Sequence, residues 1–334
     1  MKTRICFSVF LIALLLVGTI FTCKSDSAKV VTLIAADDGW DSQKFHIALA
    51  KLVIEHAYEG YELQVSTASS TMNWQSIINN DIDLNIEMWI DSYPTYHQDV
   101  LDGTIINISV LVEDSIQGIY VPRYVVEGDP SRGIAPMAPT LRRVEDLLRY
   151  PHVFPDFEDP SRGRLYGSIP GWLADTTLSR KYEYLGLDKS YNYIRLGSEA
   201  ALFMSLESAY NLGEPWVGYC WEPSWIAGKL DVIILEDAPY EHYAFQEGKT
   251  AFPDQELLTV SSREFAAKAP DILEFLKRFR TGSALLSEAL AYINDSGASY
   301  DATAVWFLKN NDALLDDWLP AENAGRLRHY ISQR

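Results

Sequence analysis

The sequence has few cysteines, and their positions leave little scope for covalent chemistry. Only three occur in 334 residues: Cys6, Cys23 and Cys220. Cys6 and Cys23 fall in the amino-terminal segment, so Cys220 is alone in the rest of the chain and has no partner there for an intrachain disulfide. No histidine is near Cys220 and its neighbours are aromatic, which favours a buried hydrophobic side chain over a nucleophile.

Motifs for metal, nucleotide and hydrolase chemistry are also lacking. The six histidines are scattered, with no HExxH motif and no cysteine pair, so no metal site is expected. No P-loop, G-x-G-x-x-G or G-x-S-x-G motif occurs. Asp37, Asp38 and Asp41 lack the spacing of a calcium loop, and we expect helix capping and a solvated turn instead. The sequence therefore gives no positive support for an enzyme or a cofactor.

Basic residues are in the minority. The chain has 46 acidic and 28 basic residues, which gives a net charge of −18. Such a chain is repelled by nucleic-acid phosphates, so no nucleic-acid partner is expected. Hydrophobic residues make up 48% of the sequence, enough for a large core, and the length favours two lobes or domains.

The first residues have the pattern of an export signal. Lys2 and Arg4 precede an apolar run from Ile5 to Phe21. Cys23 follows almost directly, as in bacterial lipoprotein signals, although small residues are usual where Phe21 and Thr22 stand.

We therefore predict a signal peptide over 1–22, lipidation at Cys23 and a tether over 23–29. These features place the protein in the periplasm or at the cell surface, anchored to the membrane by lipid. Plain secretion and an uncleaved amino-terminal anchor are the alternatives.

Strands and helices alternate in the first part of the remaining chain. The patterns predict a strand over 30–36, a helix capped by Asp41 or Ser42, a strand over 60–67, a helix over 69–78 and a strand over 83–90. This βαβαβ order predicts a parallel sheet covered on both faces. Trp89 is at the carboxyl end of the third strand, where open α/β sheets bind ligands. Packing beneath a helix is the alternative for this side chain.

A second α/β unit is predicted over about 121–240. The predicted elements there are a strand over 118–122, a crossing between lobes at 127–139, a helix after Trp172 that runs through Tyr184, a helix over 200–212 and a strand over 215–220. The rest of the chain is predicted to contain a strand over 257–261 and helices over 262–279, 282–294 and 302–308.

The stretch Gly218–Trp225 (GYCWEPSW) places three aromatic rings beside one carboxylate. Aromatic faces attract cations, by about 2 kcal/mol per ring when the site is dry, so a pocket for a methylated ammonium ion is one interpretation. The alternative is that Trp221 and Trp225, four residues apart, form a buried pair beside a turn.

Three tryptophan segments, taken together, resemble a known family. Trp89 in NIEMWIDSYP, Trp172 in GSIPGWLADT and Trp221 in VGYCWEPSW are similar to the three tryptophans of the substrate-binding proteins of quaternary-amine ABC importers, which take up glycine betaine, proline betaine and choline. Segments 37–63, 114–122 and 268–293 also resemble members of this family. The resemblance covers nearly all of residues 30–330.

The resemblance implies a fold and a function. The implied fold is the class II periplasmic-binding fold, two α/β lobes with a ligand cleft, in which 30–120 plus 245–334 form lobe 1 and 121–244 form lobe 2. The implied function is that of a monomeric receptor, not an enzyme, that delivers a quaternary ammonium osmolyte to an ABC permease and its ATPase. Glycine betaine is the first candidate; choline, carnitine, another small amine and an amino acid are alternatives, as is an exported enzyme.

The resemblance also implies which residues bind. Trp89, Trp172 and Trp221 would form an aromatic cage for the ammonium head. Backbone amides near helix starts would hold the carboxylate, at Gly39 and Trp40 or at Trp172 and Leu173.

Where some relatives have a compact polar residue beside the third tryptophan, this chain has Cys220 and Glu222, and Glu87 lies near Trp89. If Glu87 or Glu222 points into the cage, it favours a net cation such as choline over a zwitterionic betaine. The alternative for Glu222 is exposure to solvent. Trp225 is expected to support Trp221 from behind.

Overall fold

The computed structural model describes residues 30–334, except for the side chain of Asp91. The predicted signal peptide (1–22), the tether (23–29) and Cys23 lie outside these residues. The described strands form one sheet path in the order β2-β1-β3-β9-β4-β7-β5-β6, with β8 paired to β4. Their bounds are β1 (Val31–Asp37), β2 (Tyr61–Thr67), β3 (Leu84–Met88), β4 (Ile105–Pro122), β5 (Gly163–Tyr166), β6 (Tyr191–Ile194), β7 (Gly218–Glu222), β8 (Val232–Ile234) and β9 (Gln255–Ser262).

Helices cover both faces of the sheet. They are α1 (Asp41–Ala57), α2 (Ser70–Ile78), α3 (Tyr96–Leu101), α4 (Arg123–Glu127), α5 (Leu173–Tyr184), α6 (Glu199–Leu212), α7 (Trp225–Lys229), α8 (His242–Gln246), α9 (Phe265–Lys268), α10 (Pro270–Leu276), α11 (Gly282–Ser296), α12 (Tyr300–Asn310), α13 (Leu314–Trp318) and α14 (Ala321–Ser332). Short 3-10 helices are η1 (Ile90–Ser92), η2 (Pro130–Arg132), η3 (Val144–Arg149) and η4 (Leu187–Lys189). Within residues 30–334, no helix has the length and apolar character needed to cross a membrane.

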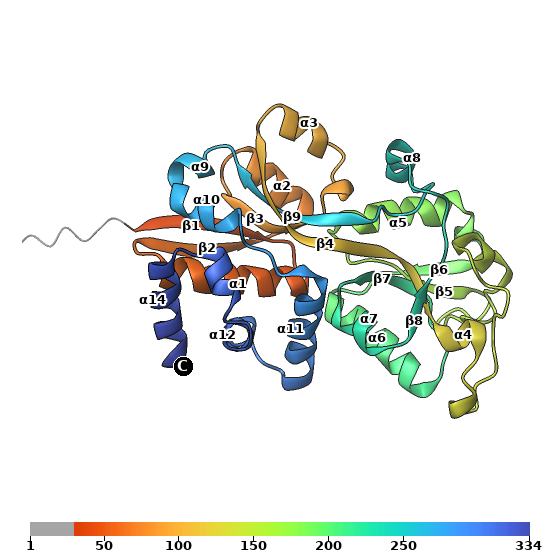
Figure 1. Ribbon diagram of the computed structural model, residues 1–334. Coiled ribbons are helices and arrows are strands. Elements are labelled where there is room, and N and C mark those ends of the chain that lie inside the picture. Colours follow the sequence, from red (N-terminus) through yellow and green to blue (C-terminus); the bar gives the residue numbers. More distant parts are fainter. Residues whose placement is uncertain (1–29) are drawn as a thin grey trace, which may run out of the picture.

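The strand β4 connects two lobes (Figure 1). Its first part pairs with β9, from Ile105 opposite Ser262, and its last part pairs with β7 and β8. The sequence predicted only 118–122 of this strand, because the polar residues at 113–115 interrupt its apolar pattern. The predicted crossing at 127–139 was wrong: this segment packs on α6, where Arg132 donates a hydrogen bond to the carbonyl oxygen of Tyr210.

The first lobe is built on the predicted βαβαβ order. β1 pairs in parallel with β2 and β3, while β9 is antiparallel to both β3 and β4. Figure 1 shows α2 on one side of this sheet and α1, α12 and α14 on the other. All five residues of β3 are buried, including Asn85 and Glu87, so two polar side chains must find partners inside the protein.

The second lobe places α5 on one side of its sheet and α6 and α7 on the other (Figure 1). α6 ends as predicted at Gly213, which has a positive φ of 72°. Near the carboxyl terminus, the single helix predicted over 262–279 is instead two helices, α9 and α10, because Pro270 cannot continue a preceding helix and begins a new one.

Contacts between the lobes satisfy N–H groups at the starts of helices. The N-cap of α1 is Trp40, whose side chain makes no cap hydrogen bond, so the prediction of capping by Asp41 or Ser42 was wrong. Instead, the N–H of Asp41 donates to Oε2 of Glu199 in α6, 2.8 Å away. The N–H of Ser70, at the start of α2, donates to the carbonyl oxygen of Gly171 at 3.3 Å. The lobes are therefore closed on each other.

Burial at this contact perturbs Glu199. It raises the pKa of the Glu199 carboxyl well above its usual range, with further increases from Asp41 and Glu87. The Asp41 N–H and the Lys44 ammonium act in the opposite direction. Glu199 therefore binds its proton more tightly in the closed protein than in an unfolded chain.

The first prediction concerns the pH dependence of stability. Because the pKa of Glu199 is raised on folding, its contribution to stability falls as pH rises from the ordinary glutamate pKa toward the raised value. Glu199→Gln keeps an oxygen that can accept the Asp41 N–H but removes the titration. The measured quantity is the unfolding temperature of the variant minus that of the unaltered protein. We expect this difference to be more positive at pH 8 than at pH 5. Glu214→Gln, at an exposed glutamate of the same lobe, is the control; the same difference at both pH values for Glu199→Gln would contradict the prediction.

Candidate ligand-binding site

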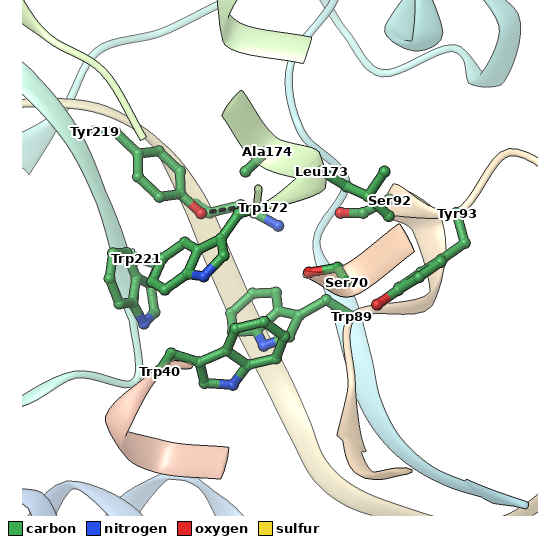
Figure 2. A pocket seen from close by; sticks show the side chains of 11 residues that line it. Trp40, Ser70, Trp89, Ser92, Tyr93, Trp172, Leu173, Ala174, Tyr219 and Trp221 are labelled. Atoms are coloured by element: carbon green, nitrogen blue, oxygen red, sulfur yellow. Dashed lines mark hydrogen bonds between the residues drawn. The ribbon is translucent and has the colours of Figure 1, made fainter. Parts of the chain in front are cut away.

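A cavity of about 40 Å³ lies between the two lobes. The volume counts the space open to the centre of a water molecule, and a single water needs roughly 10–15 Å³ of such space, so the cavity admits a small chemical group. Both lobes contribute to its lining, which is mainly aromatic with a few hydroxyl and amide groups (Figure 2). The lining residues are Trp40, Ser70, Trp89, Ser92, Tyr93, Gln117, Trp172, Leu173, Ala174, Tyr219 and Trp221.

Four tryptophan rings surround this cavity. Trp40 precedes α1 and Trp89 follows β3, both in the first lobe, while Trp172 precedes α5 and Trp221 lies in β7. The ring of Trp172 meets Trp40 edge-on at 5.5 Å and Trp221 at 5.4 Å between centroids. The structure thus brings together the three predicted tryptophans and adds the ring of Trp40, for which the sequence predicted a role only through its backbone.

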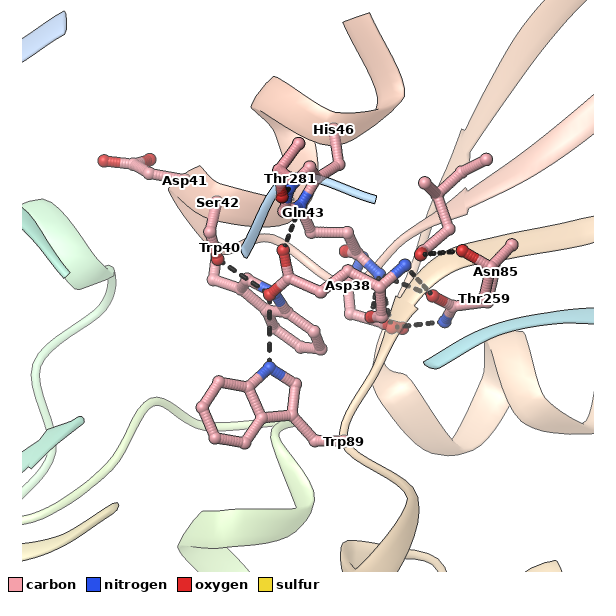
Figure 3. Close-up of polar contacts among 12 residues, drawn as sticks. Asp38, Trp40, Asp41, Ser42, Gln43, His46, Asn85, Trp89, Thr259 and Thr281 are labelled. Carbon is pink, nitrogen blue, oxygen red and sulfur yellow. Dashed lines mark hydrogen bonds and ion pairs between the residues drawn. The ribbon is translucent and has the colours of Figure 1, made fainter. Parts of the chain in front are cut away.

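A buried carboxylate fixes two of these rings. Oε1 of Glu87 accepts hydrogen bonds from Nε1 of Trp40 at 2.7 Å and from Nε1 of Trp89 at 3.2 Å (Figure 3). Glu87 is fully buried and does not line the cavity, so it does not point into the cage. Across the cleft, Nε1 of Trp172 donates to the carbonyl oxygen of Asp38 at 2.9 Å, which ties a ring of the second lobe to the first.

The backbone amides predicted to hold a carboxylate differ in availability. The N–H of Gly39 donates to Oδ1 of Asp37, and the N–H of Trp172 donates to the carbonyl oxygen of Ile169. The N–H groups of Trp40 and Leu173 have no hydrogen-bond partner among residues 30–334. Leu173 is the first residue of α5, where the helix dipole adds positive potential.

Gln117 and Tyr219 are lining residues that the sequence did not predict. Burial raises the pKa of Tyr219 well above its usual range, so its hydroxyl stays protonated and donates to Oε1 of Gln117 at 2.6 Å. This bond leaves Nε2 of Gln117 buried without a partner in the described part of the chain. No sequence signal marks Gln117, because its hydrogen-bond partner Tyr219 is distant in the chain and comes near it only where β7 pairs with β4, with Gln117 opposite Trp221.

Ser70, Ser92 and Tyr93 add hydroxyl groups on another side of the cavity (Figure 2). Ser70 begins α2, while Ser92 and Tyr93 come after Trp89, separated from it by Ile90 and Asp91. The position of Ser92 and Tyr93 after the carboxyl end of β3 is the one signal that could have marked them.

The remaining residues of the Gly218–Trp225 stretch lie outside the cavity. Glu222 is exposed and accepts a hydrogen bond from Tyr120 at 3.3 Å, so it points away from the cage. Trp225 contacts Phe203, which packs on Trp221, so it lies behind the cage wall. Cys220 is fully buried, and burial raises the pKa of its thiol to about 12, so the thiol is protonated at neutral pH.

The acidic cluster near Gly39 is not a solvated turn, contrary to the expectation from sequence. Asp38 is buried and bonded to the side-chain amides of Gln43, Asn73 and Asn85, which replace water. Burial is the main cause of the raised pKa of Asp38, and these amides act against it. Over residues 30–334, no group of three or more His, Cys, Asp or Glu side chains could hold a metal ion.

Solved structures share this fold at low sequence identity. The glycine betaine/L-proline-binding protein ProX from Borrelia burgdorferi is 17% identical, with a TM-score of 0.70 over 89% of this chain and 99% of its own. A choline-binding ABC-transporter protein in complex with choline is 17% identical, with a TM-score of 0.71 over 90% and 98%. Lactococcal OpuAC, closed on glycine betaine, is 15% identical, with a TM-score of 0.67 over 86% and 99%. The predicted two-lobed α/β fold is confirmed.

Comparison with curated protein sequences gives no significant match. A family model described as the substrate binding domain of ABC-type glycine betaine transport systems matches residues 31–310, most of the chain. The resemblance seen in the three tryptophan segments is thus confirmed, and the chain belongs to the family of substrate-binding domains of ABC-type glycine betaine transport systems.

Proposed function

We propose that this protein is an extracytoplasmic receptor of an ABC importer and binds a quaternary ammonium osmolyte, with glycine betaine as the first candidate. The observation that carries the proposal is the set of four tryptophan rings from two lobes, each at most 9% exposed, around one cavity. The family is one of substrate-binding domains, which supports a receptor over an enzyme.

The chemistry of the ligand explains why aromatic rings would suit it. A trimethylammonium group has no N–H to donate, so it is held by the electron-rich faces of aromatic rings. Each ring contributes about 2 kcal/mol when water is excluded. Trp89, Trp172 and Trp221 are proposed as the cage, with Trp40 as a fourth wall.

The carboxylate of a betaine needs hydrogen-bond donors. The free N–H groups of Trp40 and Leu173 are proposed for this role, together with Nε2 of Gln117. Gly39 has a different role in this proposal: its N–H already bonds to Asp37, and its φ of 105° shapes the turn that presents Trp40.

Ligand binding would close the two lobes. We assign 30–120 plus 245–334 to lobe 1 and 121–244 to lobe 2, which divides the chain within β4. A ligand that contacts Trp89 and Trp172 together binds the closed form more tightly and shifts the equilibrium toward it. The closed monomer would deliver its ligand to a permease with an ATPase, and lipidation of Cys23 would hold it at the membrane.

Choline, carnitine and other small amines are alternative ligands. Choline is favoured over the others because a choline-binding protein solved with choline shares the fold, with a TM-score of 0.71.

A thermal-shift experiment tests the ligand class. We expect glycine betaine or choline to raise the unfolding temperature, because a ligand at 100 times its Kd stabilises the folded state by about 2.7 kcal/mol. Glycine and ethanolamine, which lack the methyl groups, are matched controls and should have little effect. A shift with free amino acids and none with methylated amines would contradict the proposal. Recovery of a chemically altered ligand after incubation would indicate an enzyme instead.

Substitution of single cage residues tests the site. Trp172→Ala and Trp221→Ala should each weaken binding at least tenfold, since each removes a ring worth about 2 kcal/mol. Affinity is measured by calorimetric titration. Trp306→Ala is the control, because this indole stacks on Tyr292 in a groove outside the cleft. Unchanged affinity in both cage variants would refute the cage.

A further inference from the structure

We propose that Glu87 is a buried anion behind the cage, and that it selects ligands with a positively charged head by acting through Trp40 and Trp89. Glu87 does not line the cavity, so it is a positioning residue and a source of field, not a contact of the ligand. This inference rests on the proposed function and adds that the site recognises the positive charge of the ligand head.

The hydrogen bonds of Glu87 join the two cage tryptophans of the first lobe. Oε1 accepts three donors: Nε1 of Trp40, Nε1 of Trp89 and the hydroxyl of Ser42 at 2.7 Å. Trp40 and Trp89 come from different elements, and Glu87 in β3 is the group they share. One carboxylate therefore sets the orientation of both rings, with their nitrogen edges toward itself.

The same bonds place negative charge toward the cage. Indole nitrogen only donates hydrogen bonds, so Oε1 must accept from both rings and carries no proton. Oε2 is 2.6 Å from Nδ1 of His46, whose Nε2 is 2.9 Å from the Thr281 hydroxyl. His46 is on the side of the carboxylate away from the indoles, so a proton held between Oε2 and Nδ1 lies on the far side, and the lone pairs of Oε1 face the two rings.

Helix dipoles beside the cavity disfavour a bound cation, and a negative charge nearby opposes this effect. Three helices begin beside the cavity: α1 follows its N-cap residue Trp40, α2 begins at Ser70 and α5 begins at Leu173. The positive end of each helix dipole disfavours a nearby cation. A fully buried carboxylate next to the rings opposes this effect, and it is poorly screened because water does not reach it.

Three ligands of one shape separate charge from packing. Choline has a net positive charge, glycine betaine has the same head with a carboxylate, and 3,3-dimethylbutan-1-ol replaces the choline nitrogen by carbon and is neutral. The electrostatic field of Glu87 should stabilise bound choline most, because choline carries a net positive charge. It should not stabilise the neutral alcohol. For glycine betaine, repulsion of the carboxylate offsets part of the gain.

The variant that tests this is Glu87→Gln. Its amide oxygen can accept from Trp40 and Trp89 as before, and its Nε2 can donate to Nδ1 of His46, which then donates through Nε2 to Thr281. The rings keep their partners while the charge is lost. We expect the Kd of choline to rise about tenfold or more (~1.4 kcal/mol), that of glycine betaine to rise by a smaller factor, and that of the neutral alcohol to change less than about twofold.

Glu199→Gln is the matched control. It removes another buried carboxylate of the cleft, one that bonds to the Asp41 N–H and to no cage indole. It should therefore change the three affinities by a common factor. Affinities are measured by titration calorimetry, and by competition for the neutral alcohol.

Two results would overturn the inference. Equal weakening of choline and the neutral alcohol in Glu87→Gln would show that Glu87 only holds the rings, and unchanged choline affinity would show that its charge has no effect. Failure of the unaltered protein to bind any methylated ammonium compound would instead refute the proposed function, and the inference with it.

Discussion

The N–H groups at the starts of helices are the constraint on which the cleft depends. A helix leaves its first N–H groups without internal partners, and a buried N–H without a partner costs about 1–3 kcal/mol. In the closed protein, the second lobe accepts the N–H of Asp41 and that of Ser70, while the N–H of Leu173, a residue that lines the cavity, has no partner among residues 30–334. A ligand whose acceptor group takes the Leu173 N–H, as proposed, would couple the filling of the cavity to the closure of the lobes.

The site then balances opposite charges within a few residues. Helix starts favour an anion, and aromatic faces favour a cation, as would the charge proposed for Glu87 behind them. Glu199 adds a carboxyl group whose raised pKa reflects the cost of burying charge at the same contact. A zwitterion with separated ends suits such a cavity.

Local patterns predicted the parts of the structure that depend on short stretches of chain. The order β1 to β3 and the helices α5 and α6 follow from periodicity, and the three tryptophan segments were identified by their resemblance to a known family. What was missed depends on distant pairs. The partners Asp41 and Glu199 are 158 residues apart, and Gln117 meets Tyr219 across 102. No pattern in one segment can predict such contacts, and for the same reason the burial of Asp38 was not expected.

The missed ring of Trp40 shows what a sequence signal for this site would be. Trp40, Trp89 and Trp172 are all N-cap residues of the helix or 3-10 turn that follows them, and none makes a side-chain cap hydrogen bond. Ser, Thr, Asp and Asn are preferred at this position, and replacing them with an apolar residue typically costs about 1 kcal/mol. Tryptophan at the junction between a strand and a helix therefore breaks a local rule, and such breaks are expected where function outweighs stability. Trp221 and Trp225 stand out because they lie close together in an aromatic stretch. The position of Trp40 directly before its helix is the more informative sign of the binding site.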